Sequence, residues 1–259
     1  MPPVIRRAQI LEQIQRDGGV SIAELARAHG VSPVTVHRDL EQLASEGLVE
    51  RIHGGARTLT GTDPRRPATA WTQRVSQAGG AKTAIAAHAA RLVANGSTIF
   101  LDASSSALAL ARRLAEQPPN ELTLVTNSPA IVHEIASEPI HVIACPGELD
   151  QHMRMLAGRW TVEFLEQLHF DVAFISSAGV TLDAGLTTSR RPLADVLIAA
   201  TANAERTLGL IDATKFGRAG LLSIMPAQQL DLIFTDSALD AAVAQDYAAA
   251  GVRLEIVNE

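Results

Sequence analysis

The chain has 259 residues, 47% of them hydrophobic, so it can bury a large core and form one small and one medium domain. No apolar run reaches the ~18 residues that span a bilayer, and the start, MPPVIRRAQ, lacks the apolar stretch of a signal peptide, so we expect a cytoplasmic protein without a membrane partner. The formal net charge of −6 falls entirely after residue 57, since residues 1–57 hold seven basic and seven acidic side chains, and this excludes an indiscriminate polycationic DNA binder.

Two helices joined by a tight turn are predicted first. Ser21 and Glu24 have the spacing of a capping box at the start of the first helix, and Gly30 suits its left-handed end. Ser32 can cap the second helix, with Pro33 in its first turn. An apolar stripe upstream can pack on these helices or form a dimer contact, and it consists of Ile5, Ile10, Leu11 and Ile14.

The second helix has one apolar face and one face suited to DNA. Apolar residues recur at i, i+4 and i+7 and indicate a buried stripe of Val36, Leu40 and Leu43. The opposite face begins with Val34, His37 and Arg38. An arginine can read guanine and an apolar group can meet the thymine methyl, so this face is typical of a recognition helix.

The segment EGLVERIHGGA predicts a β-hairpin after the second helix. Leu48, Val49 and Ile52 alternate with charged residues as in a strand, and Gly54–Gly55 supplies a turn. Caps, turn, helix and hairpin in this order predict a winged helix-turn-helix DNA-binding domain over residues 1–57, although a helical hairpin at a domain interface would share parts of the pattern. The residues predicted to contact double-stranded operator DNA are Ser32, Val34, Thr35, His37, Arg38, Arg51, His53, Gly54 and Gly55.

Residues 58–71, TLTGTDPRRPATAW, combine Gly, Pro and small polar residues and are predicted to form a linker. Helices and strands then alternate over residues 72–259. Short continuous apolar strands between amphipathic helices imply an α/β domain with a mainly parallel sheet covered on both faces. The predicted helices span 72–94, 105–117, 129–137, 159–168, 193–204 and 239–250, and the predicted strands span 98–102, 122–126, 140–145, 171–176, 207–212, 230–234 and 253–257.

Polar loops follow several predicted strands, at the sheet edge where ligands of such folds bind. Asp102 and the three serines after Ala103 open a helix, so their hydroxyls and amides can cradle an anion, although serines are also ordinary helix caps. Similar loops follow the neighbouring strands, at Thr126-Asn127-Ser128, Gly147, Ser177-Ala178-Gly179 and Thr187-Thr188.

Lysine usage gives a further indication of this site. Of 22 basic residues, 20 are arginine, and the two lysines are Lys82 and Lys215. A compact ammonium suits a phosphate in a tight pocket. Cys145 is expected to fill a strand end in the core, and the eight histidines show no paired ligand spacing, so we predict no metal and no other cofactor.

The first domain resembles the DeoR family of bacterial transcription regulators. The resemblance rests on Val31-Ser32, Arg38-Asp39-Leu40, Leu43, Gly47-Leu48 and His53-Gly54-Gly55-Ala56. The family usually places two adjacent arginines before the aspartate, and here the first is His37. The replacement implies an altered base preference or a weaker phosphate contact.

The second domain is similar to the family's sensor domain, whose fold is related to sugar phosphate isomerases and which is taken to bind phosphorylated sugars. The resemblance runs through Lys82, the Asp102 loop, Thr126-Asn127-Ser128, Gly158, Gly185-Leu186-Thr187-Thr188 and Asp212-Ala213-Thr214-Lys215-Phe216-Gly217. The effector-binding residues expected from the loops and the resemblance together are Lys82, Asp102, Ala103, Ser104, Ser105, Ser106, Thr126, Asn127, Gly147, Gly179, Thr188, Arg190, Arg191 and Lys215.

Departures from the family cluster in this pocket. Serines replace the usual glycine and threonines after Asp102, and Pro146-Gly147 replaces a glycine pair. After Thr188 the family places acidic residues and a lysine, whereas this chain has Arg190-Arg191-Pro192 and, near the lysine position, Leu197. We hypothesise that Arg190 or Arg191 supplies the missing cation, so that the effector carries a further anionic group such as a sulfonate or a second phosphate.

A DNA-binding domain followed by a domain similar to a sugar phosphate sensor predicts a transcription regulator, by default a repressor of a carbohydrate catabolism operon. It would act as a homodimer or homotetramer and leave operator DNA when a small phosphorylated or sulfonated sugar binds, with no catalytic residue assigned. An isomerase-like enzyme is the first alternative, and it would need a base near the substrate carbon. The candidate bases are Asp102, Glu148, Asp150 and Asp183. The second alternative, an architectural DNA-binding protein, gives the α/β domain no role.

Overall fold

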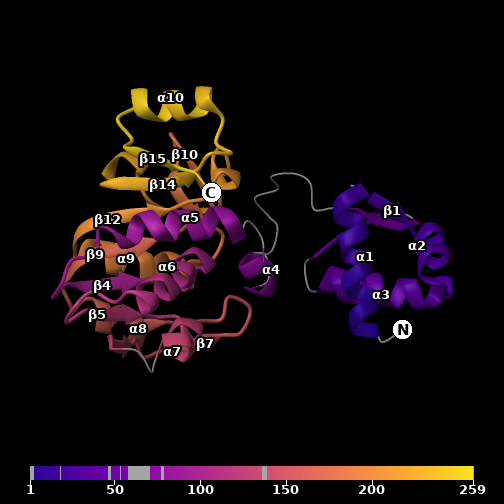
Figure 1. The fold of residues 1–259 in the computed structure, drawn as a ribbon, viewed down its shortest axis with the longest axis horizontal. Coiled ribbons are helices and arrows are strands. Elements are labelled where there is room, and N and C mark those ends of the chain that lie inside the picture. Colours follow the sequence, from indigo (N-terminus) through magenta and orange to yellow (C-terminus); the bar gives the residue numbers. More distant parts are fainter. Residues whose placement is uncertain are drawn as a thin grey trace. The chain divides into compact units, whose positions relative to one another are not determined.

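The computed structural model describes residues 3–17, 19–45, 48–52, 54–57, 71–76, 79–135 and 139–258. His53 and residues 58–70 of the predicted linker lie outside these ranges. The chain folds into two compact units, Met1–Asp63 and Pro64–Glu259 (Figure 1). None of the described helices is long and apolar enough to cross a membrane.

The first unit packs three helices against a three-stranded antiparallel sheet with the strand order β1-β3-β2. The helices are α1 (Pro3–Asp17), α2 (Ile22–His29) and α3 (Pro33–Ser45). The strands are β1 (Gly19–Ser21), β2 (Glu50–Ile52) and β3 (Gly55–Arg57). The predicted helix-turn-helix is therefore formed by α2 and α3, and the wing by β2 and β3.

Capping interactions set the ends of α2 and α3 as predicted. Ser21 Oγ accepts the Glu24 amide at 3.2 Å, while the Glu24 carboxylate accepts the Ser21 amide at 2.9 Å, which completes the capping box. Gly30 ends α2 with a φ of 63°, a left-handed conformation that glycine adopts without steric strain. Ser32 Oγ accepts the Thr35 amide at 3.2 Å at the start of α3.

One apolar cluster forms the core of this unit. The predicted stripe of α3 is confirmed, since Val36, Leu40 and Leu43 are almost fully buried. Ile10 and Ile14 of α1 belong to the same cluster and are fully buried, so these two residues of the N-terminal stripe are not available for a dimer contact.

The wing differs from the prediction at its turn. Ile52 pairs with Gly55, so Gly55 begins β3 instead of forming part of the turn. Gly55 also pairs with Ser21 of β1, a strand that the sequence pattern did not predict. A Cβ at Gly55 would lie 2.4 Å from the Val20 carbonyl oxygen, so the close pairing of β1 with β3 requires glycine at this position.

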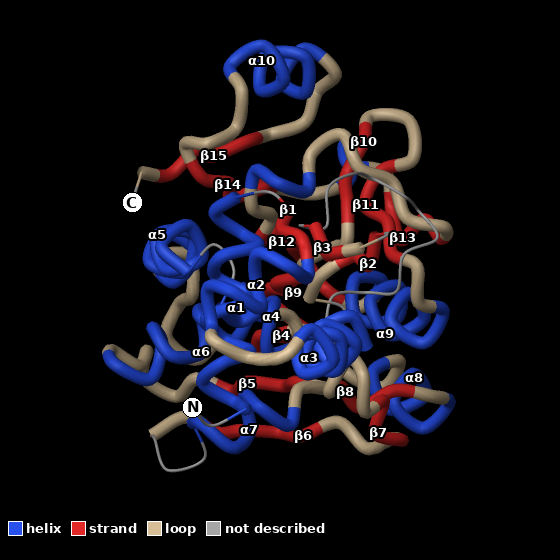
Figure 2. The backbone as a smooth tube through the Cα atoms, turned by 90° about the vertical axis from the view of Figure 1, so that its right-hand side faces the viewer, coloured by secondary structure: helices blue, strands red, loops and turns tan. Residues whose placement is uncertain are grey.

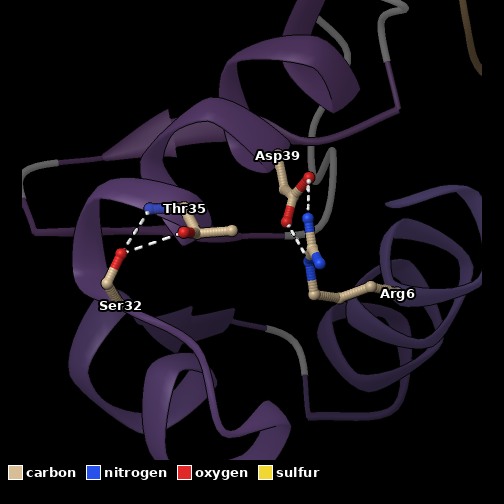
Figure 3. A network of polar contacts seen from close by, with 4 residues as sticks. All are labelled: Arg6, Ser32, Thr35 and Asp39. Carbon is tan, nitrogen blue, oxygen red and sulfur yellow. Dashed lines mark hydrogen bonds and ion pairs between the residues drawn. The ribbon is translucent and has the colours of Figure 1, made fainter. Parts of the chain in front are cut away.

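A buried ion pair joins α1 to α3 (Figure 3). Arg6 Nε donates to Asp39 Oδ2 at 2.6 Å and Arg6 Nη2 donates to Asp39 Oδ1 at 3.2 Å, so the guanidinium engages both carboxylate oxygens. Asp39 is only 4% exposed. The pair therefore fixes α3 against α1 on the side of α3 that faces away from solvent.

The second unit contains a seven-stranded sheet in the order β15-β14-β12-β9-β4-β5-β6, in which every pair is parallel. Its strands are β4 (Thr98–Leu101), β5 (Thr123–Thr126), β6 (His141–Ala144), β9 (Phe170–Ile175), β12 (Ala204–Leu210), β14 (Leu232–Asp236) and β15 (Leu254–Val257). The predicted parallel α/β architecture is confirmed.

Helices cover both faces of this sheet (Figure 2). One face carries α5 (Gly79–Ala90), α6 (Ser105–Glu116) and α7 (Pro129–Ile135), and the other carries α8 (Arg159–Leu165) and α9 (Arg191–Ala202). Leu110 and Ile131 represent the first apolar layer, and Leu165 and Val196 represent the second. The second layer also includes Tyr247 of α10 (Ala241–Ala249).

Several elements differ from their predicted form. The predicted helix 72–94 is two helices, α4 (Trp71–Ser76) and α5, because two glycines, which are poor helix formers, stand at the start of α5. Trp71, assigned above to the linker, begins α4 and is only 9% exposed. Five short strands in two further antiparallel sheets were missed, since three or four residues carry too little periodicity to be recognised. They are β7 (Glu148–Asp150), β8 (Met155–Ala157), β10 (Gly179–Thr181), β11 (Gly185–Thr188) and β13 (Leu222–Met225).

Replacing Asp39 by alanine is expected to destabilise the first unit, because the substitution leaves the Arg6 guanidinium without its buried carboxylate partner. We expect the melting temperature of this unit to fall by at least ~5 °C, with faster hydrogen exchange in α1 and α3. The matched control is Glu41→Ala on the exposed face of α3, expected to change stability little. Equal effects of the two substitutions would contradict a structural role for the pair.

Candidate functional site

The exposed face of α3 presents residues that the sequence predicts to contact DNA. Val34 is 64% exposed, and His37 and Arg38 are also exposed. Ser32 and Thr35 lie at the start of the helix, with their hydroxyl oxygens 2.9 Å apart (Figure 3). An apolar group, an imidazole and a guanidinium thus project from the first turns of α3, a set suited to base edges in a major groove.

Arg51 of β2 connects the wing to this face. Arg51 Nη1 donates to the His37 carbonyl at 3.3 Å, and Arg51 Nη2 lies 3.2 Å from His37 Nε2. His37 Nδ1 lies 3.5 Å from a Glu41 carboxylate oxygen. His37, the residue that departs from the family pattern, therefore contacts the wing as well as facing outward. Gly54, with a φ of 80° and open space where a Cβ would stand, lies at the tip of the wing.

Asp102, directly after β4, organises the carboxyl edge of the large sheet. Its Oδ1 accepts the Ser104 amide at 3.0 Å and its Oδ2 accepts the Ser176 amide, in the loop after β9, at 2.8 Å. Ser104 in turn caps α6, with its Oγ accepting the Ala107 amide at 3.0 Å. Burial raises the pKa of Asp102, while these amides and the positive charge of Arg74 act in the opposite direction.

The loop after β5 is buried, and one of its polar side-chain atoms lacks a hydrogen-bond partner among the described residues. Thr126 Oγ1 donates to the Leu101 carbonyl at 2.7 Å and accepts the Ser128 amide at 3.0 Å. Asn127 Nδ2 donates to the Leu156 carbonyl at 2.9 Å. Asn127 Oδ1 is buried and has no hydrogen-bond partner among the residues that the structure describes, so this amide oxygen can accept a donor from a ligand.

The predicted glycines mark close approaches of the backbone. A Cβ at Gly147 would lie 2.1 Å from Thr161 Oγ1, and one at Gly179 would lie 2.2 Å from the Arg218 carbonyl oxygen. Gly179 and Thr188 belong to the small sheet of β10, β11 and β13, which reaches the Lys215 segment because the Gly217 amide donates to the Val180 carbonyl at 3.0 Å. Gly147 and Gly179 therefore allow backbone segments to lie close together.

The two lysines lie near each other in one cluster of charged side chains. Burial is the main cause that lowers the pKa of Lys82; Asp212 opposes this shift, while Lys215 and Arg74 add to it as like charges. Burial also lowers the pKa of Lys215, again against Asp212 and together with Arg218 and Arg74. The positive charge of Arg74 lowers the pKa of both lysines, and such a group of neighbouring cations is suited to receiving an anion.

Arg74 of α4 is a pocket residue that the sequence analysis missed. Its Nη2 donates to the Met153 carbonyl at 3.1 Å, its guanidinium carbon lies 5.3 Å from the centroid of the Trp71 ring, and its own carbonyl accepts the Lys82 ammonium. Arg74 Nε is buried without a hydrogen-bond partner among the described residues. One arginine among 20 carries no distinguishing signal in a sequence, and only its position eight residues before Lys82 could have marked it.

The two arginines that the sequence places in the site lie at the start of α9. Arg191 Nε donates to Asp195 Oδ1 at 2.7 Å within α9, and the Arg191 side chain is 76% exposed. It lines a groove between α8 and α9 together with Arg159 and Glu163. Arg190 caps the same helix through its backbone and is half-buried. Neither arginine is among the charges that shift the pKa values of the two lysines, whereas Arg74 is.

The remaining reactive groups offer little chemistry. Cys145 is 2% exposed in the core, and burial raises the pKa of its thiol to about 12. Within the described ranges, no three or more His, Cys, Asp or Glu side chains are grouped to hold a metal ion. The edge of the large sheet thus combines the charged cluster, the unpartnered Asn127 Oδ1 and the start of α6, features that are suited to an anion.

Comparisons with known proteins agree over both units. Residues 6–62 match the family model of the DeoR-like helix-turn-helix domain, and residues 77–237 match that of the DeoR C terminal sensor domain. Similar proteins include the HTH-type transcriptional regulator GlpR of Haloferax volcanii, 31% identical over 97% of both chains, and GolR of Listeria innocua, 31% identical over the full length of both. The glycerol-3-phosphate regulon repressor of Escherichia coli is 28% identical over 97% of this chain and 98% of its own.

Among solved structures, ribose 5-phosphate isomerase A from Neisseria gonorrhoeae matches 53% of each chain with 14% identity. The TM-score of this match is 0.40, which is too low to carry an argument about the fold or the chemistry.

Lys215→Met is expected to raise the melting temperature of the second unit by about 2 °C, because it replaces a half-buried ammonium, whose charged form is disfavoured by desolvation, with an apolar side chain of similar length. Lys82→Met is the contrast: it removes the donor to the Arg74 carbonyl and is expected to lower the melting temperature. Calorimetry with and without inorganic phosphate completes the test. Phosphate should stabilise the native chain and not Lys215→Met, and a drop in stability for Lys215→Met without phosphate would contradict the charge argument.

Proposed function

We propose a function on the premise that the chain belongs to the DeoR family of transcriptional regulators, whose two domain models match it over residues 6–62 and 77–237. The chain acts as a repressor that binds operator DNA through α3 and leaves it when a small phosphorylated or sulfonated sugar enters the pocket at the edge of the large sheet. The observation that supports this proposal is the cluster of three cations near the edge of the large sheet, in which Lys82 is buried and Arg74 and Lys215 are half-buried.

The DNA contact is assigned to the first turns of α3. Val34 and Arg38 are the candidates for direct readout, because they are exposed and stand on the recognition helix. Arg51 and the tip of the wing at Gly54 are assigned to the DNA backbone, where a guanidinium and an open glycine can approach phosphates. The first 57 residues have no net charge, so two heads supplied by a homodimer or homotetramer would be needed for tight binding.

The effector contact is assigned to the cations and to the start of α6. The Ser104 amide is paired with Asp102 and the Ala107 amide with Ser104 Oγ, which leaves the amides of Ser105 and Ser106 as donors to an anion at this helix terminus. Asn127 Oδ1 is suited to accept a sugar hydroxyl. We propose that Arg74 supplies the further cation that the sequence predicts at Arg190 or Arg191, because Arg74 lowers the pKa of both lysines while Arg191 pairs with Asp195.

An enzymatic role at the same pocket is disfavoured by the state of its carboxylate. Both oxygens of Asp102 already accept backbone amides, so Asp102 holds two loops together and is poorly placed to take a proton from a substrate. We therefore propose binding without a chemical step.

Fluorescence anisotropy on DNA from upstream of the chain's own gene tests the proposal. The panel of compounds comprises glycerol 3-phosphate, pentose and hexose phosphates, their sulfonate counterparts and inorganic phosphate. Binding that resists competitor DNA and is released by one of these compounds supports an effector-controlled repressor. Absence of specific binding, with and without each compound, would refute the proposal.

Arg38→Ala is expected to weaken operator binding roughly 10- to 100-fold and to reduce discrimination against a substituted site, as expected for loss of one good base contact. Glu41→Ala, on the same face of α3, is the matched control and should retain discrimination. Equal loss on operator and random DNA would instead assign Arg38 to the phosphate backbone.

Effector affinity is expected to fall as the pH rises through the lowered pKa values of Lys82 and Lys215. A bound anion favours the charged ammonium, so affinity is greatest while both lysines are protonated and is lost as they deprotonate. Because their pKa values are lowered, the loss should begin below the ordinary lysine pKa of about 10.4. Calorimetric titration from neutral to alkaline pH with a sulfonate, whose charge is constant, measures this. Constant affinity up to the ordinary lysine pKa would contradict the assignment.

A further inference from the structure

The short helix α4 is the first described element of the second unit, and it contacts the proposed effector pocket directly. Residues 58–70 connect the head to it along the chain. We infer that α4 carries the effector signal from the pocket toward the head, with Arg74 as the coupling residue. This inference rests on the proposed function, because it explains how an anion bound among the lysines changes what the DNA-binding unit does.

Among the described contacts that hold α4 in place, three involve Arg74. The Lys82 ammonium on α5 donates to the Arg74 carbonyl, and the Arg74 guanidinium donates to the Met153 carbonyl between β7 and β8. Trp71 provides the third contact, since its buried ring packs in the core layer of α5 and α6 while the Arg74 guanidinium lies against it. The same cation that attaches α4 to the pocket therefore also contacts its aromatic anchor.

An anion in the pocket competes with these contacts. Lys82, now a donor to α4, would turn to the stronger charged acceptor. Arg74 is half-buried, its buried Nε lacks a partner within the described part of the chain, and the positive charges of Lys82 and Lys215 lie nearby. Moving it toward the anion satisfies Nε and relieves the repulsion, but it draws the guanidinium away from Trp71 and from the Met153 carbonyl.

Occupied and empty pockets thus favour two different arrangements of α4. An effector can shift an equilibrium between arrangements only through different contacts in each, and the exchange of partners by Lys82 and Arg74 provides that difference. By linkage, the factor by which the effector weakens DNA binding must equal the factor by which DNA weakens effector binding. Arg74 contributes to this coupling factor, and not only to effector affinity.

Trp71 reports the movement directly. The chain has two tryptophans, and the other, Trp160, is 66% exposed on α8, so Trp160→Phe leaves Trp71 as a single fluorophore at little structural cost. In Trp160→Phe, the most effective compound of the panel, or inorganic phosphate as the minimal anion, is expected to change Trp71 emission with the same concentration dependence as DNA release.

The decisive comparison is the ratio of DNA dissociation constants with and without saturating compound. We expect a ratio on the order of 10 or more in the native chain. In Arg74→Gln we expect a ratio close to 1, while calorimetry still detects the compound bound through Lys82 and Lys215. Arg113→Gln is the matched control, because Arg113 pairs with Glu116 on the surface of α6 and should leave the ratio unchanged. Trp71→Leu, which keeps Arg74 but removes its ring partner, is expected to reduce the ratio as well.

The possible outcomes distinguish a failure of the coupling role of α4 from a failure of the proposed function. If the compound releases the native chain, Arg74→Gln and Trp71→Leu from DNA equally well, the coupling role of α4 is wrong, while the proposed regulator function is still supported. If Arg74→Gln no longer binds the compound, the Trp71→Leu variant tests the inference instead. A ratio of DNA dissociation constants equal to that of the native chain would overturn the inference, and a reduced ratio would support it. If no compound releases the native chain, the proposed function fails and the inference fails with it.

Discussion

The constraint on which the second unit depends is the burial of positive charge at the carboxyl edge of a parallel sheet. Arg74, Lys82 and Lys215 lose hydration there, and burial lowers the pKa of each. Such a cluster is tolerable only if acidic groups stand nearby and backbone carbonyls accept the donors. Asp102 and Asp212 provide the first condition, and the carbonyls of Arg74 and Met153 provide part of the second. An anionic ligand would add negative charge to a cluster in which Asp102, Asp150 and Asp212 already act on the three cations.

In the first unit, helix α3 has a buried side that packs inside the unit and an exposed side that carries the predicted DNA contacts. Asp39 turns inward to the Arg6 guanidinium, while its neighbours His37 and Arg38 stay exposed. Because the inward side is fixed by an ion pair and an apolar stripe, the outward side is free to vary with the DNA sequence it must read. His37 shows the limits of that freedom, since its ring and carbonyl also contact Arg51 of the wing.

Local signals in the sequence were sufficient for a large part of this structure. The capping box at Ser21 and the stripe through Leu40 depend on neighbours a few residues apart, and parallel strands are apolar runs that need no partner to be recognised. Features that depend on distant segments were not predictable. Gly55 looked like a turn residue because its contact with Val20 is a tertiary one. Arg74 was not singled out, because only the fold brings it close to the two lysines.

The choice of lysine at two positions alone has a chemical consequence. Every other basic side chain is a guanidinium, which acylating reagents leave untouched, so Lys82 and Lys215 are the only side-chain amines of the chain. Their lowered pKa values increase the fraction present as the free, nucleophilic amine at neutral pH. An acyl group transferred to either lysine side chain would remove a positive charge from the proposed effector site, so lysine modification of this protein would act on that site alone.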